Sequence, residues 1–273
     1  MSTGAGPWDP GQYHKFSDHR RRPAVELLAR VPPVDPSFVV DLGCGSGEIT
    51  HLIAERWPQA RVQGVDNSPD MLERASVADD GDGNGRARVE WVEADIRSWT
   101  PPAPPGLVYA NAALQWVDEH EALFPRLFAA LAPGGVLAVQ MPRSREARSH
   151  ILMHETLLCA GHDSTPIGPE PLRREIARKW VLDPGEYFDL LAPDADRLDI
   201  WTTEYLQVLR GDDPVLEWVS GTGLRPILNG LAGEERTRFL DVYRPALRAA
   251  YPRRADGTTL YPFPRLFIVA VRA

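Results

Sequence analysis

Lysine is nearly absent from the sequence, which has it only at Lys15 and Lys179. The other 28 of the 30 basic residues (30 − 2 = 28) are arginine, and 38 acidic residues bring the formal net charge to −8. Such an acidic chain is a poor nucleic-acid surface, because nucleic-acid-binding domains usually carry a net positive face. The arginine bias agrees with a GC-rich genome. The planar guanidinium of arginine also suits carboxylates and phosphates. Only the positions of the arginines can show whether the bias reflects genome composition or anion binding.

Cysteine and long apolar runs are scarce as well. Two cysteines, Cys44 and Cys159, cannot build a disulfide framework. No stretch approaches the roughly 18 apolar residues of a membrane span, and no apolar run of a signal peptide opens the chain. We therefore expect a cytoplasmic protein with reduced cysteines and no membrane partner.

Strand and helix patterns alternate through the first half of the 273 residues. This alternation predicts an α/β fold, with a mostly parallel sheet and helices on both faces. After Pro142 the alternation stops, which indicates a helical cap made of late insertions. The expected strands are 38–42, 61–66, 88–93, 107–110, 136–141, 199–209 and 266–271. The expected helices are 23–30, 49–57, one from Pro69, 119–131, and two or more in 213–250.

The same patterns predict an order of domains along the chain. A core interrupted by two insertions explains them better than two sequential domains. The expected segments are an N-terminal lid and helix (1–35), a cofactor-binding core (36–142), a cap insertion (143–198), a core strand (199–212), cap helices (213–260) and a final core strand (261–273).

A glycine-rich loop is the strongest local signal. Residues 41–47 read DLGCGSG, directly after an apolar strand and before a helix. Glycines let the backbone turn tightly and approach a ligand. The dinucleotide pattern G-x-G-x-x-G fails because Glu48 takes the third glycine's place, and the P-loop lysine is missing. Asp41 would repel a pyrophosphate and suits a ligand with a cationic amine.

An acidic residue follows at the end of the second strand. Asp66 lies nineteen residues after Gly47, where a carboxylate can accept hydrogen bonds from both ribose hydroxyls. A ligand with an amino-acid end and a ribose, held without a phosphate cradle, matches S-adenosylmethionine, which we therefore expect as the cofactor. The other cofactor residues expected from the strand ends, beside Gly43, Gly45 and Gly47, are Asn67, Met71, Asp95 (on the adenine amino group), Ile96 (over the ring) and Asn111.

Taken together, these residues resemble class I S-adenosylmethionine-dependent methyltransferases, and more closely the trans-aconitate 2-methyltransferase family. The resemblance covers nearly the whole chain, including the cap. It rests on residues 8–32 (WDPGQYHKFSDHRRRPAVELLARVP), 92–97 (VEADIR), 110–116 (ANAALQW), 136–142 (VLAVQMP), 218–219 (WV), 222–226 (TGLRP) and 263–270 (FPRLFIVA). Departures lie at residues 79–85, 143–148 and 160–185.

The resemblance implies methyl transfer to one carboxylate of trans-aconitate, a small tricarboxylate. A carboxylate of ordinary pKa is already ionised at pH 7, so we expect no catalytic acid or base. The methyl acceptor is an anion, so its binding pocket needs cationic side chains, together with other side chains that line the pocket. The candidates are the arginines Arg20, Arg22, Arg225 and Arg265, the tyrosines Tyr13 and Tyr187, the tryptophans Trp116 and Trp218, and Gln115.

Other functions stay open at this point. His150 and His154 share a helix face, but the glutamate of H-E-x-x-H is replaced by Ile151, so we expect no metal. The alternatives are a methyltransferase for another small acid or a natural product, and a non-catalytic S-adenosylmethionine-binding protein. A nicotinamide oxidoreductase is disfavoured by Asp41 and Glu48. The sequence predicts no oligomeric state.

Overall fold

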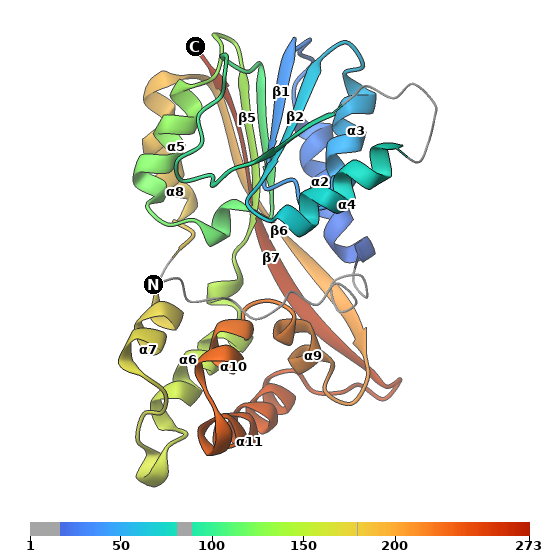
Figure 1. Cartoon of the computed structure of the whole chain (residues 1–273). Helices are drawn as coiled ribbons and strands as arrows, with labels where there is room; N and C mark the ends of the chain where they lie inside the picture. Colours follow the sequence, from blue (N-terminus) through green and yellow to red (C-terminus); the bar gives the residue numbers. More distant parts are fainter. Residues whose placement is uncertain (1–16, 81–88, 179) are drawn as a thin grey trace. The chain divides into compact units, whose positions relative to one another are not determined.

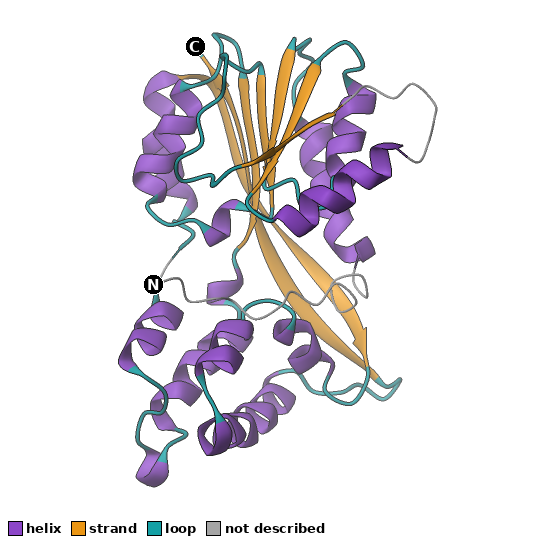
Figure 2. Ribbon diagram, in the orientation of Figure 1, coloured by secondary structure: helices purple, strands orange, loops and turns teal. Residues whose placement is uncertain are grey.

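We describe a computed structural model of the chain, covering residues 17–80, 89–178 and 180–273. Figure 1 shows its helices and strands and Figure 2 their types. The helices are α2 (Ser17–Arg30), α3 (Glu48–Arg56), α4 (Pro69–Asp80), α5 (His120–Ala129), α6 (Arg148–Cys159), α7 (Glu170–Ala177), α8 (Pro184–Leu191), α9 (Pro214–Ser220), α10 (Arg225–Gly230) and α11 (Gly233–Ala250). The strands are β1 (Phe38–Leu42), β2 (Arg61–Asp66), β3 (Val89–Glu93), β4 (Leu107–Asn111), β5 (Val136–Pro142), β6 (Ala195–Arg210) and β7 (Thr258–Arg272).

The seven strands form one sheet in the order β3-β2-β1-β4-β5-β7-β6. The pairs β1–β2, β2–β3, β1–β4 and β4–β5 are parallel, and β7 runs antiparallel to β5. The strand order reverses between β1 and β4, and ligands of open α/β sheets bind beside such a reversal, at the carboxyl ends of the strands. The sheet thus confirms the expected fold class and places the glycine loop at this point.

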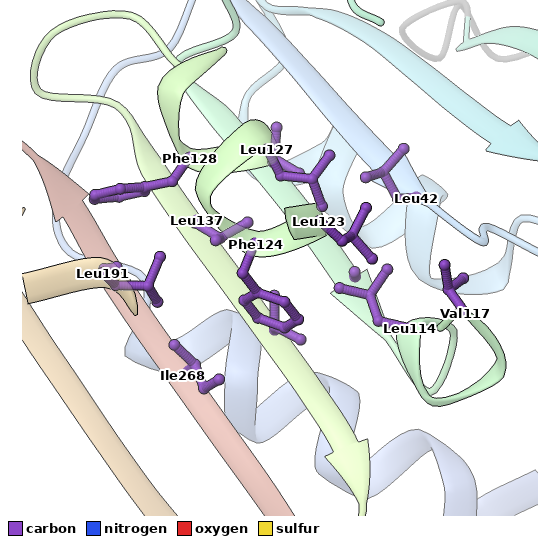
Figure 3. Packing of buried hydrophobic residues seen from close by; sticks show 14 of the residues in the cluster. Leu42, Leu114, Val117, Leu123, Phe124, Leu127, Phe128, Leu137, Leu191 and Ile268 are labelled. Atoms are coloured by element: carbon purple, nitrogen blue, oxygen red, sulfur yellow. The ribbon is translucent and has the colours of Figure 1, made fainter. Parts of the chain in front are cut away.

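Helices cover both faces of the five parallel-paired strands: α2, α3 and α4 lie on one face, and α5 and α8 on the other (Figure 1). Helix α5 presents Leu123, Phe124, Leu127 and Phe128 to the sheet, at the spacing of one helix face. Figure 3 shows these side chains packed with Leu42, Leu137 and Ile268. Phe124 is fully buried, and truncation of a buried phenylalanine to alanine costs about 3–5 kcal/mol.

The chain divides into two compact units. Unit 1 consists mainly of residues 143–178 and 204–264, with its own apolar core; unit 2 contains Arg20–Pro142, Trp180–Thr203 and Arg265–Ala273. The cap insertion expected over 143–198 differs from this division, because 180–203 lie in unit 2. The reason is that α8 packs on α5, with Tyr187 and Leu191 buried in the core of that unit. No helix of the described residues is long and apolar enough to cross a membrane.

Candidate functional site

The glycine loop bends between β1 and α3 with three glycines in left-handed backbone: φ is 72° at Gly43, 56° at Gly45 and 79° at Gly47. The Gly43 amide donates to the Val65 carbonyl of the next strand (2.7 Å). A Cβ on Gly43 would lie 2.2 Å from the Ala113 Cβ and 3.8 Å from the Ile96 Cδ1. The turns after β3 and β4 therefore meet the backbone of the glycine loop, as the three strand ends were expected to do.

Asp66 ends β2 beside this loop. Its Oδ2 accepts the Gly45 amide (2.9 Å) and its Oδ1 accepts the Ser68 amide (2.9 Å). Each carboxylate oxygen has further lone-pair capacity, so Asp66 can fix the loop and still accept ligand hydroxyls. Two other predicted residues follow it: Asn67 is exposed, and Met71 is half-buried in the first turn of α4.

Asp41 lies beneath the loop at the end of β1 and is 3% exposed. The hydroxyl of Thr50, on α3, donates to its Oδ2 (2.6 Å). Burial raises the pKa of Asp41 from 3.8 to about 7; the Thr50 hydrogen bond opposes this shift and the Asp66 charge adds to it. A buried carboxylate of this kind is stabilised by a cation. The sequence reasoning missed Thr50, whose only signal was a polar residue on the buried face of an amphipathic helix.

The turn after β3 presents Asp95 and Ile96. The backbone amide and the guanidinium of Arg97 both donate to Asp95 (2.9 and 3.0 Å to Oδ1), which lowers the pKa of that carboxyl. Arg126 of α5 donates to the Ile96 carbonyl (2.7 Å) and to the Trp99 carbonyl (2.6 Å) from behind the turn. The adenine contacts expected of Asp95 and Ile96 stay a prediction.

Asn111 is the last residue of β4 and leads into the turn that follows this strand. Its side-chain Oδ1 is buried and accepts no hydrogen bond from any residue that the structure describes, and the same holds for Oε1 of Gln115. The Gln115 Nε2 donates to the Ala112 carbonyl (2.7 Å). Trp116, in contrast, is 62% exposed. Two buried acceptors thus lie in one short turn next to the glycine loop.

The residues expected to bind the acceptor are spread over both units. Within unit 2, Arg22 lies on the exposed side of α2 and pairs with Glu26 (2.7 Å). Arg265, on β7, is 4% exposed and donates to Oε1 of Gln140 (3.0 Å). Arg225 is half-buried at the start of α10 in unit 1. Tyr13 and the side chain of Arg20 lie outside the described residues.

Two aromatic residues differ from the expectation that they wall a pocket. Tyr187 is fully buried in unit 2, with its hydroxyl 2.6 Å from His120 Nδ1. Trp218 is 5% exposed in the core of unit 1, edge-on to Phe263 (ring centroids 5.7 Å apart). Both side chains pack in hydrophobic cores, so we leave them out of the acceptor site.

His150, one of the two histidines considered as metal ligands, is half-buried next to a serine hydroxyl. His150 lies beside Ser149 Oγ (3.2 Å), and burial together with the Arg145 charge lowers its pKa to about 4. Within residues 17–80, 89–178 and 180–273, no group of three or more His, Cys, Asp or Glu side chains is arranged to hold a metal ion.

Comparison with known proteins gives the class first. Residues 39–135 match the sequence model of a methyltransferase domain. Solved structures of similar fold include YcgJ of Bacillus subtilis (TM-score 0.56, 11% identity, covering 92% of this chain and 98% of that one) and phosphoethanolamine N-methyltransferase 2 of Haemonchus contortus (TM-score 0.52, 18% identity, 92% and 52%). The fold and the glycine loop therefore define a Rossmann-like methyltransferase.

Closer relatives identify the family. Proteins named trans-aconitate 2-methyltransferase are 48% identical over 269 residues in Azoarcus sp. strain BH72 (97% of this chain, 99% of the relative) and 47% identical over 274 residues in Streptomyces coelicolor (99% and 88%). The relative from Pseudomonas aeruginosa is 44% identical over 263 residues (96% and 93%). The chain belongs to the trans-aconitate 2-methyltransferase family, which confirms the resemblance.

Proposed function

We propose that this enzyme transfers a methyl group from S-adenosylmethionine to one carboxylate of trans-aconitate, forming the monomethyl ester. The observation that carries the proposal is the meeting of the Gly43 backbone with Ala113 and Ile96, beside Asp66, at the strand-order reversal. The full-length similarity to relatives of that name, at 44–48% identity, supports the choice of acceptor.

The residues of the site fit this cofactor by their chemistry. The side chains that we propose for this site are mostly hydrogen-bond acceptors: the Asp66 carboxylate, and the Asn111 and Gln115 oxygens, which accept no hydrogen bond from the described residues. The buried charge of Asp41 adds a negative potential below the loop. A ligand with a cationic amine and ribose hydroxyls supplies the matching donors, whereas a pyrophosphate does not.

We assign Asp66 and Asn67 to the ribose, Asp95, Ile96 and Met71 to the adenine side, Asp41, Gly43, Gly45 and Gly47 to the amino-acid end, and Asn111 to the methyl-transfer centre. When bound, S-adenosylmethionine supplies a methyl carbon on a positively charged sulfur, which is open to attack by a carboxylate oxygen. The chain's residues then have to orient this oxygen and exclude water. Such positioning can contribute roughly 7–11 kcal/mol to lowering the barrier.

No side chain has to remove a proton from the acceptor, because a carboxylate of ordinary pKa is ionised at pH 7. The residues we assign to the acceptor are Gln115, Trp116 and the arginines Arg22, Arg225 and Arg265. Arginine–carboxylate pairs are often bidentate, which fixes orientation as well as adding energy. Of these residues Arg225 is the first to test, because its TGLRP segment is shared with the family.

A direct assay tests the proposal. The purified chain is incubated with S-adenosylmethionine and trans-aconitate, cis-aconitate, citrate or isocitrate, and NMR identifies the esterified carboxylate. We expect transfer to trans-aconitate to be far faster than to the other three acids. Equal rates on all four, or transfer only to unrelated acids, would contradict the assigned acceptor. Cofactor binding without turnover on any di- or tricarboxylate would contradict the assigned reaction.

A further inference from the structure

Three consecutive hydrogen bonds cross the core of unit 2, and their direction is fixed. The Leu182 amide donates to the Tyr187 hydroxyl (3.1 Å), this hydroxyl lies 2.6 Å from His120 Nδ1, and His120 Nε2 lies 2.9 Å from the Leu114 carbonyl. A carbonyl can only accept, so Nε2 carries the proton. In a neutral imidazole Nδ1 is then an acceptor, and the Tyr187 O–H donates to it. Burial lowers the pKa of His120, which favours this neutral form.

The chain of bonds ends on the turn that follows β4. Leu114 opens a short 3-10 helix (Leu114–Trp116), and its carbonyl also accepts the Val117 amide (3.0 Å). Figure 3 shows Leu114 and Val117 among the core side chains next to Leu123 of α5. His120 is the first residue of α5 and is 1% exposed. His120 at the start of α5 and Tyr187 on α8 therefore support this turn through consecutive hydrogen bonds.

The turn itself is strained and needs such support. Ala112 has φ 52°, a left-handed conformation that is unfavourable for a residue with a Cβ. Strained residues persist where the surrounding structure determines their conformation. Here the Ala112 amide donates to the Gln140 carbonyl (2.9 Å), and Gln115 Nε2 donates to the Ala112 carbonyl (2.7 Å).

The strained turn packs directly against the glycine loop. Ala113 occupies the space that a Gly43 Cβ would take. On either side of it, Asn111 Oδ1 and Gln115 Oε1 are buried without donors from the described residues. Hydrogen-bond acceptors at this place suit the positively charged, methyl-bearing end of the proposed cofactor.

We propose that His120 and Tyr187 are positioning residues that hold the turn 112–117 against the glycine loop and so place the Asn111 and Gln115 oxygens at the reacting end of the site. The inference rests on the proposed function. It differs from the role of Arg126, which lies on the same helix and supports the turn of Ile96 on the adenine side. The two ends of α5 therefore serve two different parts of one cofactor site.

Tyr187→Phe is the sharpest variant, because it removes one oxygen from a buried ring. We expect kcat at saturating substrates to fall about tenfold, the equivalent of one hydrogen bond of about 1.4 kcal/mol, while the Kd of S-adenosylhomocysteine changes less than threefold. His120→Gln keeps an N–H for the Leu114 carbonyl and is expected to retain most of kcat, unlike His120→Leu. The matched control is Tyr243→Phe, which removes the same atom from a buried tyrosine in unit 1, where its hydroxyl donates to the Ser149 carbonyl (3.1 Å), and is expected to leave kcat within about threefold.

Two readouts separate positioning from simple destabilisation. Long-range ¹H–¹⁵N spectra of the ligand-free enzyme are expected to show His120 as the Nε2–H tautomer, with its Nδ1 signal moved by Tyr187→Phe. Circular dichroism checks that the variants are folded. An Nδ1–H tautomer, or kcat values of Tyr187→Phe and His120→Leu within twofold of wild type, would overturn the inference. A wild-type enzyme inactive on trans-aconitate would instead contradict the proposed function, and the tautomer still tests the hydrogen-bond chain.

Discussion

Asp41→Asn is expected to make the ligand-free protein more stable and its cofactor binding weaker. The carboxyl is 3% exposed and accepts a hydrogen bond from the Thr50 hydroxyl. Folding therefore removes it from water, and this hydrogen bond offsets only part of the lost hydration. Asparagine has nearly the same shape, keeps an oxygen for the Thr50 hydroxyl and carries no charge. The substitution therefore removes the desolvation penalty together with the charge that attracts a cationic ligand.

The size of the stability effect follows from the pKa of Asp41. Folding raises this pKa from 3.8 to about 7, so the folded protein keeps the proton at pH values where the unfolded chain has lost it. The carboxyl's contribution to stability is fully present below about pH 4 and is lost as the pH rises through about 7. At pH 8 the loss amounts to roughly 4 kcal/mol, and at pH 5 to roughly 1.5 kcal/mol. The amide of the Asp41→Asn variant does not titrate, so it has no such dependence.

Chemical denaturation at pH 5 and pH 8, monitored by circular dichroism, measures the free energy of unfolding of the wild type and of Asp41→Asn. We expect the stability advantage of the variant over wild type to grow by about 2.5 kcal/mol between the two pH values. Calorimetric titration should show S-adenosylmethionine bound roughly 10–100-fold more weakly by the variant at pH 8, and wild-type affinity rising with pH through about 7.

The matched control is Asp35→Asn, the same chemical change at an exposed position six residues earlier, which should alter neither property. The reasoning is refuted if Asp41→Asn is less stable than wild type at pH 8, or if the difference between them is the same at both pH values.

Three further substitutions test the rest of the site. Gly43→Ala should weaken cofactor binding more than tenfold in a titration, because the new Cβ would lie 2.2 Å from that of Ala113; Ala113→Gly in the same chain should restore part of the affinity, and no restoration would speak against that clash. Asp66→Asn should weaken cofactor binding roughly 10–100-fold, because an NH₂ group then faces the amide of Gly45 or Ser68; an unchanged Kd would remove Asp66 from the ribose site. Arg225→Ala should raise the KM for trans-aconitate roughly 10–100-fold, the loss of a charge-assisted pair, with cofactor affinity unchanged; an unchanged KM would exclude Arg225 from the acceptor site.

The sheet was predictable because short apolar runs and glycines mark its parallel strands. The expected strand 38–42 coincides with β1, and 61–66 with β2. The last strand was expected over 266–271, yet β7 begins at Thr258. Pro262 and Pro264 argue against a strand because proline has no amide to donate. In a strand, the amides of residues two apart point to the same edge. Pro262 and Pro264 therefore both lack a donor on one edge of β7, and hydrogen bonding along its other edge is not affected.

The site was predictable where one motif contains it and not where distant residues meet. Asp41 to Gly47 is a single segment with Asp66 at a typical spacing. By contrast, His120 and Tyr187 are 67 residues apart, and each reads locally as an ordinary helix residue. Their pairing depends on α8 packing on α5, which periodicity does not encode.

Gly64, in the middle of β2, connects the sheet to the cofactor loop in another way. A Cβ there would lie 2.4 Å from the indole of Trp91 on β3 and 3.2 Å from the sulfur of Cys44 in the loop. The indole of Trp91 on β3 therefore occupies the space that a side chain at Gly64 on β2 would need. Among homologues, residues 64 and 91 should vary together, with a side chain at 64 only where 91 is small. A side chain introduced at Gly64 is therefore expected to destabilise the protein unless residue 91 is made smaller in the same variant.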